Sequence, residues 1–201
     1  MRFRPTIVVP AAGRGSRFGG ALHKLEQPFN GSTVLVSSVR RAIQSQLPVV
    51  VVTTAARAPG LANLLATRDV VVLSDADAAL GMGASIAAGV AERSGAPGWL
   101  VLPGDMPLVH PNSILAVASA LEQHPVVYAQ YRGRRGHPVA FAAELYSELI
   151  MLRGDEGARR VMARYPAHGQ EVDDPGVLLD VDTADDLQAA RKASGQAQPA
   201  D

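Results

Sequence analysis

Short apolar runs alternate along the chain with segments in which apolar residues recur at the spacing of one helix face. Within each run the apolar residues follow one another without alternating polar residues, so each run is predicted to be a strand buried on both faces. Predicted strands are Thr6–Val9, Val49–Thr53, Val70–Leu73 and Trp99–Leu102, and predicted helix faces lie at Leu35–Ile43, Ile86–Ala91 and Ile114–Leu121. This order of strands and helices predicts a three-layer α/β/α fold, in which helices cover both faces of a mostly parallel sheet.

The pattern changes beyond residue 125. Val126–Ala129 and Pro138–Phe141 flank a basic turn, which predicts two paired strands. The other predicted elements are helices near Ala142–Leu152 and Glu156–Tyr165, a strand at Leu178–Val181 and a helix from Ala184 to Ala193. Residues 194–201 lack apolar content and are predicted to be a disordered tail. Because no linker divides the rest, residues 1–193 are predicted to form a single domain.

Composition narrows the range of functions. Nineteen Lys and Arg residues balance nineteen Asp and Glu residues, so the chain lacks the broad basic surface with which proteins bind nucleic acids or anionic membranes. The absence of Cys excludes disulfides, thiolate metal sites and a Cys nucleophile, and agrees with a cytoplasmic location. No apolar run approaches the roughly 18 residues of a membrane span, and Ile7–Val9 is too short for a signal peptide. Because basic and acidic residues are balanced, any anion-binding site must be confined to a local group of residues.

A glycine-rich turn follows the first predicted strand. It spans residues 11–20, reads Ala-Ala-Gly-Arg-Gly-Ser-Arg-Phe-Gly-Gly, and is closely followed by Lys24. Ligands of α/β sheets bind beyond the carboxyl ends of strands, where small residues let backbone N–H groups approach a polyphosphate. Arg14, Arg17 and Lys24 add positive charge there. The alternative is an ordinary turn with solvated arginines.

The turn matches neither of two common nucleotide-binding sequences. A dinucleotide fingerprint requires Gly at the position of Phe18 and an acid after the second strand, which ends in Thr53 and Thr54. A P-loop requires Gly-Lys-Ser or Gly-Lys-Thr, which the turn lacks. A dinucleotide-dependent oxidoreductase and a P-loop ATPase are therefore both disfavoured.

The glycine-rich turn and five later segments together resemble the molybdenum cofactor cytidylyltransferases, within the molybdopterin-guanine-dinucleotide-synthase-like group of nucleotidyltransferases. The later segments are Gly81–Ser85, Leu102–Pro107, Gly136–Val139, Gly154–Arg159 and Asp180–Thr183. The resemblance covers roughly residues 6–190. It implies a Rossmann-like nucleotidyltransferase domain that moves CMP from CTP to molybdenum-bound molybdopterin and releases pyrophosphate. It also implies Mg²⁺ as the cofactor, with Mn²⁺ as a substitute.

The resemblance assigns roles to residues of the turn and of a later helix start. The nucleotide would be surrounded by Ala11, Ala12, Gly13, Arg14, Gly15, Ser16, Gly81 and Ser85. Arg17 and Lys24 would act catalytically, near the charge that develops during transfer. Alanine at position 12 resembles the cytidylyl enzymes, whereas glycine there accompanies the guanylyl enzymes.

The chain departs from the family pattern just before Lys24. His23 replaces an acid that family members usually carry directly before this lysine, and the spacing from the glycines is one residue longer. An exposed Lys24 outside the site is therefore the alternative to a catalytic one.

Two carboxylates are candidate metal ligands. Asp105 follows the fourth predicted strand in a turn bounded by Pro and Gly, and Mg²⁺ needs one or two carboxylates besides phosphate oxygens and water. The alternative for Asp105 is a turn-forming role. The resemblance makes Asp182 the second ligand and Asp105 part of the catalytic set. The alternative for this segment is a helix start capped by Thr183 and Asp186.

The basic turn is the candidate acceptor site. Arg132, Arg134, Arg135 and His137 gather there in a chain without net charge. Such a cluster can receive an anionic pterin, and the resemblance makes Arg135, His137 and Asp155 the acceptor contacts. The alternatives are a solvated basic turn, a His137 packed within its strand, and an Asp155 that caps a helix.

Two further functions stay open at this point. One is a nucleotidyltransferase of the same fold with another phosphorylated acceptor, such as a sugar phosphate or a small phosphorylated acid. The other is a non-catalytic nucleotide-binding or cofactor-binding chaperone for a molybdenum enzyme. The expected partners are the small-molecule substrates and a molybdenum enzyme that receives the cofactor, with no nucleic acid and no membrane.

Overall fold

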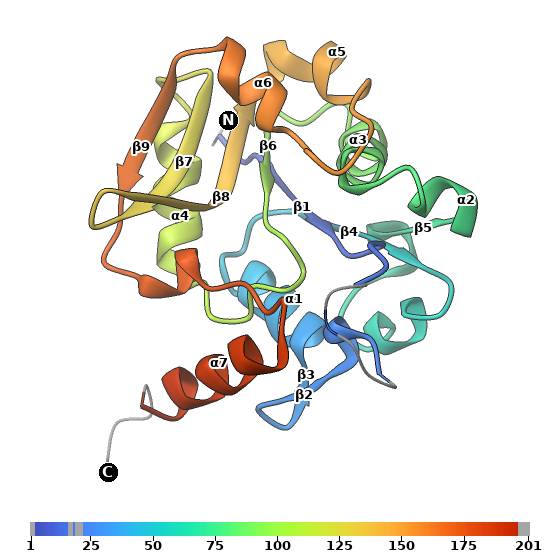
Figure 1. The fold of residues 1–201 in the computed structure, drawn as a ribbon. Helices are drawn as coiled ribbons and strands as arrows, with labels where there is room; N and C mark the ends of the chain where they lie inside the picture. The colour runs from blue at the N-terminus through green and yellow to red at the C-terminus, as the bar shows by residue number, and fades with distance from the viewer. Residues whose placement is uncertain (1–2, 16–17, 19–21, 197–201) are drawn as a thin grey trace.

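The computed structural model describes residues 3–15, 18 and 22–196, which form a seven-stranded sheet covered by helices (Figure 1). In spatial order the strands are β5 (Val70–Leu73), β4 (Val49–Thr54), β1 (Thr6–Pro10), β6 (Gly98–Val101), β8 (Arg134–Ala142), β7 (Val126–Tyr131) and β9 (Ala167–Glu171). The pairs β5–β4, β4–β1, β1–β6 and β7–β9 are parallel, whereas β8 is antiparallel to both of its neighbours. The predicted mostly parallel sheet is confirmed.

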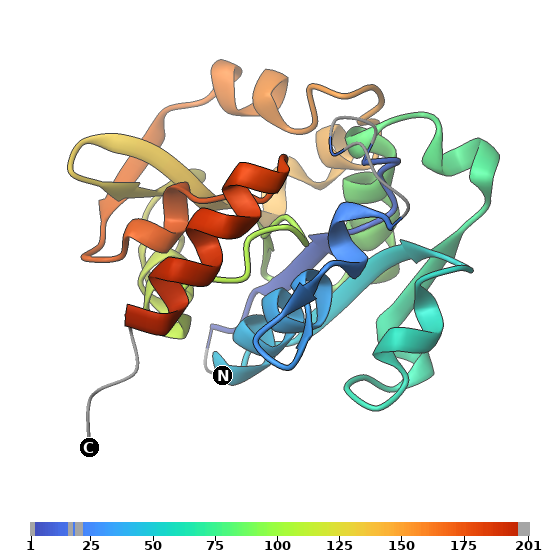
Figure 2. The same cartoon turned by 60° about the horizontal axis from the view of Figure 1, so that its bottom comes forward.

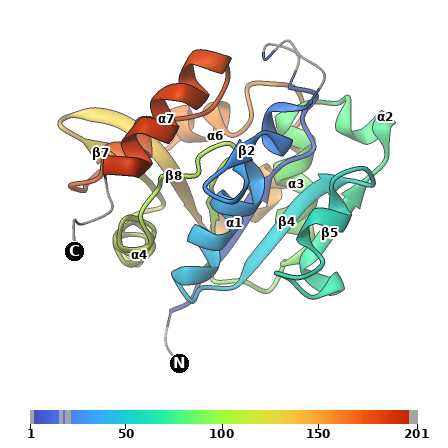
Figure 3. The same ribbon diagram turned by 90° about the horizontal axis from the view of Figure 1, so that it is seen from below.

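The helices lie on both faces of this sheet (Figures 1 and 3). They are α1 (Val34–Gln44), α2 (Asp75–Ala78), α3 (Met82–Glu92), α4 (Pro111–Ala120), α5 (Tyr146–Leu149), α6 (Arg159–Arg164) and α7 (Ala184–Gln196). Because successive side chains of a strand point to opposite faces, Ile7 and Val9 pack with α1 and α4, while Val8 packs with α3. The predicted three-layer α/β/α arrangement is confirmed.

Short elements complete the connections. They are a two-stranded hairpin of β2 (Pro28–Phe29) and β3 (Ser32–Thr33), and the 3₁₀ helices η1 (Lys24–Glu26), η2 (Ala58–Leu61), η3 (Thr67–Asp69), η4 (Ala143–Leu145) and η5 (Pro175–Leu178). Neither the hairpin nor α2 was among the predicted elements, because both are too short to show a hydrophobic period. The prediction that β5 is buried on both faces is wrong: β5 is an edge strand, and Val72 is 50% exposed.

The predicted strand at Leu178–Val181 is also wrong. The last strand of the sheet is instead β9, which is parallel to β7 at the opposite edge from β5. Its sequence, Ala-His-Gly-Gln-Glu, has no apolar run, so backbone pairing rather than burial defines it. The 178–181 segment leaves η5 and docks on the turn after β6, where the Val181 N–H donates to the Asp105 carbonyl at 2.9 Å.

Two predicted helices are shorter than expected and one is longer. The 142–152 segment is divided between η4 and α5, and the helix expected at 156–165 begins only at Arg159. The last helix, α7, continues to Gln196, three residues beyond its predicted end. Arg191 of α7 donates to the Pro28 carbonyl, which fixes the helix beside the β2–β3 hairpin (Figure 2). Within the described residues, no helix is long and apolar enough to cross a membrane.

Candidate active site

Two adjoining cavities open beyond the carboxyl ends of β1 and β6. The first, of about 540 Å³, is lined by the glycine-rich turn and is called the loop cavity below. The second, of about 550 Å³, is lined by β8 and the segments after α5 and η5, and is called the hairpin cavity. Both cavities are lined by Lys24, Met82, Pro103, Asp105, Asp155 and Asp182. These six residues form the boundary at which molecules bound in the two cavities would meet.

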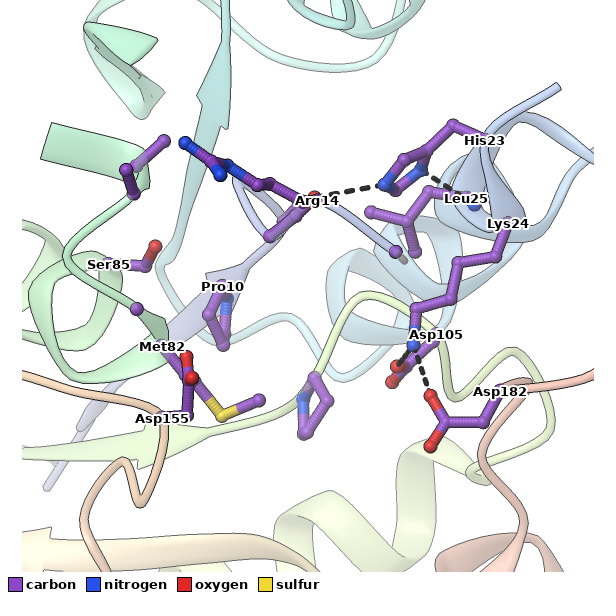
Figure 4. Close-up of a pocket in the computed structure, with 17 residues that line it drawn as sticks. Pro10, Arg14, His23, Lys24, Leu25, Met82, Ser85, Asp105, Asp155 and Asp182 are labelled. Carbon is purple, nitrogen blue, oxygen red and sulfur yellow. Dashed lines mark hydrogen bonds and ion pairs between the residues drawn. The ribbon is translucent and has the colours of Figure 1, made fainter. Parts of the chain in front are cut away.

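Lys24 lies between two carboxylates at this boundary (Figure 4). Its Nζ donates to Asp105 Oδ2 at 2.6 Å and to Asp182 Oδ1 at 2.5 Å. Burial alone would lower the pKa of Lys24, but the charges and hydrogen bonds of Asp105 and Asp182 outweigh it and raise that pKa. The ammonium is therefore charged at neutral pH. The structure thus brings Lys24 into the cavity despite the longer spacing from the glycines.

Two contacts hold the carboxylates in place. The Val181 N–H donates to the Asp105 carbonyl, which ties the Asp182 segment to the turn after β6. The cap of α7 is made by Thr183 and Asp186, whose Oδ2 accepts from the Thr183 N–H at 2.8 Å and from its hydroxyl at 2.7 Å. The capping arrangement and the approach of Asp182 to Lys24 therefore occur together. The helix-capping role of this segment and the proposed ligand role of Asp182 are compatible.

A buried carboxylate that lines neither cavity anchors the same segment. Asp174, only 9% exposed, precedes η5 and was not among the candidate residues. Its Oδ2 accepts from the His110 N–H and the Ser113 hydroxyl, both at 2.7 Å, and its Oδ1 accepts from the Gly176 N–H at 2.9 Å. With all these bonds made, Asp174 fixes η5 to the start of α4. Its sequence context, an Asp before Pro in a loop, gave no sign of this role.

The donor set at the boundary fits a divalent cation held jointly with a phosphate-bearing ligand. Asp105 Oδ1 is buried and has no hydrogen-bond partner among the residues that the structure describes. No group of three or more His, Cys, Asp or Glu residues suitable for a metal occurs within 3–15, 18 and 22–196. A cation at Asp105 and Asp182 would therefore take its other ligands from water and phosphate oxygens, as Mg²⁺ commonly does.

The described part of the glycine-rich turn lines the loop cavity unevenly. Ala11, Gly13, Arg14 and Gly15 all line it. Ala12 does not line either cavity and is only 2% exposed, so any effect it has on a ligand must act through the packing of the turn. The Arg14 side chain extends away from Lys24 and the two carboxylates (Figure 4). The candidates Ser16 and Arg17 lie outside the described residues.

Two side chains outside the turn hold its backbone. Arg57, which follows β4, donates from Nε to the Ala11 carbonyl at 3.1 Å and from Nη2 to the Gly13 carbonyl at 3.2 Å. His23 Nε2 lies 2.9 Å from the same Gly13 carbonyl. Arg57 could not be predicted as a site residue, because a lone Arg in a polar loop has no pattern that distinguishes it from a solvated residue.

The opposite wall of the loop cavity comes from the start of α3. Ser85, Met82 and Asp155 lie across the cavity from Lys24 (Figure 4). Gly81 has a φ of +89°, and a Cβ there would lie 2.5 Å from the Gly154 carbonyl carbon. Glycine is therefore required for the close approach of these two segments, where the Gly83 N–H also donates to the Gly154 carbonyl at 2.9 Å. Asp155 does not cap α6, which begins at Arg159 without a side-chain cap.

The hairpin cavity combines an apolar wall with charged groups. Arg135, His137, Arg159 and Asp180 line it, together with apolar side chains that include Phe141 and Met162. Arg132 and Arg134 are exposed and do not line it, so the predicted basic cluster is only partly gathered there. Arg159 and Asp180 belong to segments that sequence analysis singled out, but neither was chosen as a site residue.

The pKa values of two groups that line the hairpin cavity are shifted in opposite directions. Burial lowers the pKa of His137, and the positive charge of Arg159 lowers it further against the opposing effect of Asp105. The imidazole is therefore neutral at neutral pH and has both a donor and an acceptor nitrogen. Burial raises the pKa of Asp180, and the negative charge of Asp105 adds to this rise.

The chain is similar to several known proteins along most of its length. The purine catabolism protein PucB of Bacillus subtilis is 29% identical over 91% of this chain and 94% of its own length. The molybdenum cofactor cytidylyltransferase of Escherichia coli is 24% identical over 92% of this chain and 94% of its own length. The crystal structure of Rv0371c from Mycobacterium tuberculosis in complex with manganese has a TM-score of 0.77 and 27% identity, and the match covers 94% of this chain and 99% of that one.

A family model also matches most of the chain. The model describes the MobA-like NTP transferase domain and matches residues 7–172, which include the glycine-rich turn, Lys24 and Asp105. With the Rossmann-like sheet and the two cavities at its carboxyl edge, this match shows that the chain belongs to the family of MobA-like NTP transferase domains, which are nucleotidyltransferases.

Proposed function

We propose that this nucleotidyltransferase moves CMP from CTP to molybdenum-bound molybdopterin. The observation that carries the proposal is the shared boundary of the two cavities, where Lys24, Asp105 and Asp182 lie together. A terminal phosphate oxygen of the acceptor would attack the α-phosphorus of CTP from the hairpin cavity. The bond from that phosphorus to the bridging oxygen would break, and pyrophosphate would leave on the side of the loop cavity.

Catalysis of such a transfer rests on positioning and on neutralisation of crowded phosphate oxygens. Asp105 and Asp182 would hold the divalent cation, Mg²⁺ or Mn²⁺, and the manganese complex of the Mycobacterium tuberculosis relative supports this choice of metal class. When bound, the cation supplies positive charge to the phosphate oxygens. With a cation at the carboxylates, the Lys24 ammonium would turn from them to the phosphoryl group under attack.

The remaining residues would bind the two substrates. Backbone N–H groups of Gly13, Arg14 and Gly15 would face the triphosphate, and Ser16 and Arg17 are proposed to continue this contact. Ser85 and Gly81 would border the ribose and base.

In the hairpin cavity, Arg135 and Arg159 would neutralise acceptor charge. The neutral imidazole of His137 would donate and accept hydrogen bonds, and the carboxylate of Asp155 would accept them. The apolar wall near Phe141 suits a fused-ring acceptor such as a pterin. The product would then pass to a molybdenum enzyme.

One comparison favours a second candidate. The Bacillus subtilis relative, named for purine catabolism, is 29% identical to this chain, against 24% for the Escherichia coli cytidylyltransferase. The second candidate is the same nucleotidyl transfer to another phosphorylated acceptor. An acceptor panel with pyrophosphate detection separates the two: release only with the molybdenum cofactor supports the first, and release with a sugar phosphate or a small phosphorylated acid supports the second.

We expect CTP to be preferred over GTP by at least about tenfold in kcat/KM, a ratio that corresponds to about 1.4 kcal/mol. Arg57 holds the Ala11 and Gly13 carbonyls, so the turn would present a fixed surface to the bound nucleotide. A base that does not fit leaves buried polar groups unpaired, at about 1–3 kcal/mol each. Competition between the two nucleotides at equal concentration measures the preference.

A substitution within the turn tests the structural basis of this preference. Ala12→Gly removes a buried Cβ, loosens the packing beneath the turn and is expected to reduce the preference. Equal use of CTP and GTP by the unmodified protein would contradict the cytidylyl assignment without affecting the nucleotidyltransferase family.

A further inference from the structure

We propose that His23 is a positioning residue that sets Lys24 at a fixed distance from the glycine-rich turn. The inference rests on the proposed transfer at Lys24, but it concerns how this chain places the ammonium. His23 directly precedes Lys24, and its ring is hydrogen-bonded to the backbone of Gly13 and of Leu25, which both line the loop cavity.

The two ring nitrogens make different bonds. The Leu25 N–H donates to Nδ1 at 3.1 Å, which caps the first turn of η1. Since Nδ1 accepts, the proton of the neutral ring is on Nε2, which then donates to the Gly13 carbonyl at 2.9 Å. One side chain therefore connects the backbone of the turn with the backbone that carries Lys24.

Arg57 also holds the Gly13 carbonyl to which His23 is bonded. Its Nη2 donates to the same Gly13 carbonyl at 3.2 Å, and Arg57 itself follows the buried strand β4. The carbonyl of Gly13 is thus held by two donors. Because the carbonyl and N–H of one peptide unit point in opposite directions, these bonds also fix the direction of the Arg14 N–H.

The His23 ring packs closely against Gly15 of the turn, so it can set the distance between the turn and Lys24. Gly15 has a φ of +61°, and a Cβ there would lie 2.6 Å from His23 Nε2. Burial lowers the pKa of His23, and Arg57 and Lys24 lower it further against Glu26 and the Gly13 carbonyl, so the ring is neutral at neutral pH. The neutral ring has the one donor and one acceptor that the two bonds require.

Two substitutions separate the two bonds. His23→Gln places an amide N–H near the position of Nε2, and His23→Asn places an acceptor near the position of Nδ1, where Asn is a good helix cap. If the bond to Gly13 positions Lys24, His23→Ala and His23→Asn should both lower kcat about tenfold with less than about a threefold change in KM for CTP. His23→Gln should recover most of kcat. Recovery by Asn but not by Gln would show that His23 only caps η1, and would overturn the proposal.

A double-mutant cycle tests whether the effect acts through Lys24. In a Lys24→Met background, His23→Ala should lower the residual kcat by less than about twofold. A full tenfold loss in that background would mean that His23 acts independently of Lys24. Thermal unfolding of each variant identifies losses that are merely structural.

A readout without turnover keeps the inference separate from the proposed function. Nitrogen chemical shifts of the His23 ring should report a neutral imidazole protonated at Nε2. A ring protonated at Nδ1, or at both nitrogens at pH 7, would overturn the inference whether or not any nucleotide is consumed. Absence of pyrophosphate release with the expected tautomer present would instead refute the proposed function alone.

Discussion

Replacement of Asp105 by Asn is expected to remove most turnover and to leave the fold intact. Within the described part of the chain its buried Oδ1 has no hydrogen-bond partner, and its Oδ2 lies 2.6 Å from Lys24 Nζ. The amide removes the negative charge that would hold the cation, and loss of one preorganised charge contact costs about 3–4 kcal/mol, or 10²–10³ in rate. The backbone bond from Val181 to the Asp105 carbonyl does not depend on the side chain, so the unfolding temperature should change little.

The measurement is the rate of pyrophosphate release as a function of Mg²⁺ concentration. Asp182→Asn should show a loss in the same direction, because Asp182 is the second proposed ligand. Asp185→Asn is the matched control: it removes an equal charge three residues further along, at an exposed position in the first turn of α7. Full Mg²⁺-dependent activity in Asp105→Asn would exclude Asp105 from the catalytic site.

Replacement of Lys24 by Met is expected to lower kcat by about 10²–10³ and to raise KM for CTP much less. Met keeps most of the aliphatic chain and removes the ammonium that Asp105 and Asp182 now hold. An interaction made mainly with the developing charge of the transition state affects kcat rather than ground-state binding. Steady-state kinetics at saturating Mg²⁺ separate the two parameters.

The same variant has a second expected effect, on metal binding. Without the ammonium, the carboxylates of Asp105 and Asp182 have lost the positive charge that partly neutralises them, with side chains only 14% and 20% exposed. A divalent cation can then bind without competition from Lys24, so Mn²⁺ should bind Lys24→Met more tightly than the unmodified protein when no nucleotide is present. Near-normal kinetics for this variant would place Lys24 outside the reaction and weaken the catalytic interpretation as a whole.

The order of strands and helices could be predicted because burial on both faces leaves a strong pattern. Thr6–Pro10 and Val49–Thr54 are apolar runs that form buried interior strands of the sheet, and both were recognised. Ala167–Glu171 is an edge strand of mixed polarity that pairs through its backbone, and no hydrophobic pattern marks it. Short elements such as α2 could not be predicted either, because they too lack a recognisable hydrophobic pattern.

The candidate site was predictable where chemistry follows from position at a strand end. Asp105 and the glycine-rich turn follow neighbouring strands, so their proximity comes from the topology of the sheet. The contacts of His23 and Arg57 were not predictable, because their partners are backbone carbonyls whose direction depends on the folded turn. The spacing between the glycines and Lys24 is one residue longer than in the family, which allowed an exposed Lys24 outside the site. In the structure, η1 and its His23 cap bring the lysine to Asp105.

The fate of the labelled phosphates of CTP tests the central claim most directly. The protein is mixed with molybdenum-bound molybdopterin, Mg²⁺ and CTP that is labelled either at the α-phosphorus or at the γ-phosphorus. Nucleotidyl transfer predicts that the α label enters a cytosine dinucleotide of the acceptor while the γ label appears only in pyrophosphate. Transfer of the γ label to the acceptor, or release of neither label under conditions in which CTP binds, would contradict the account.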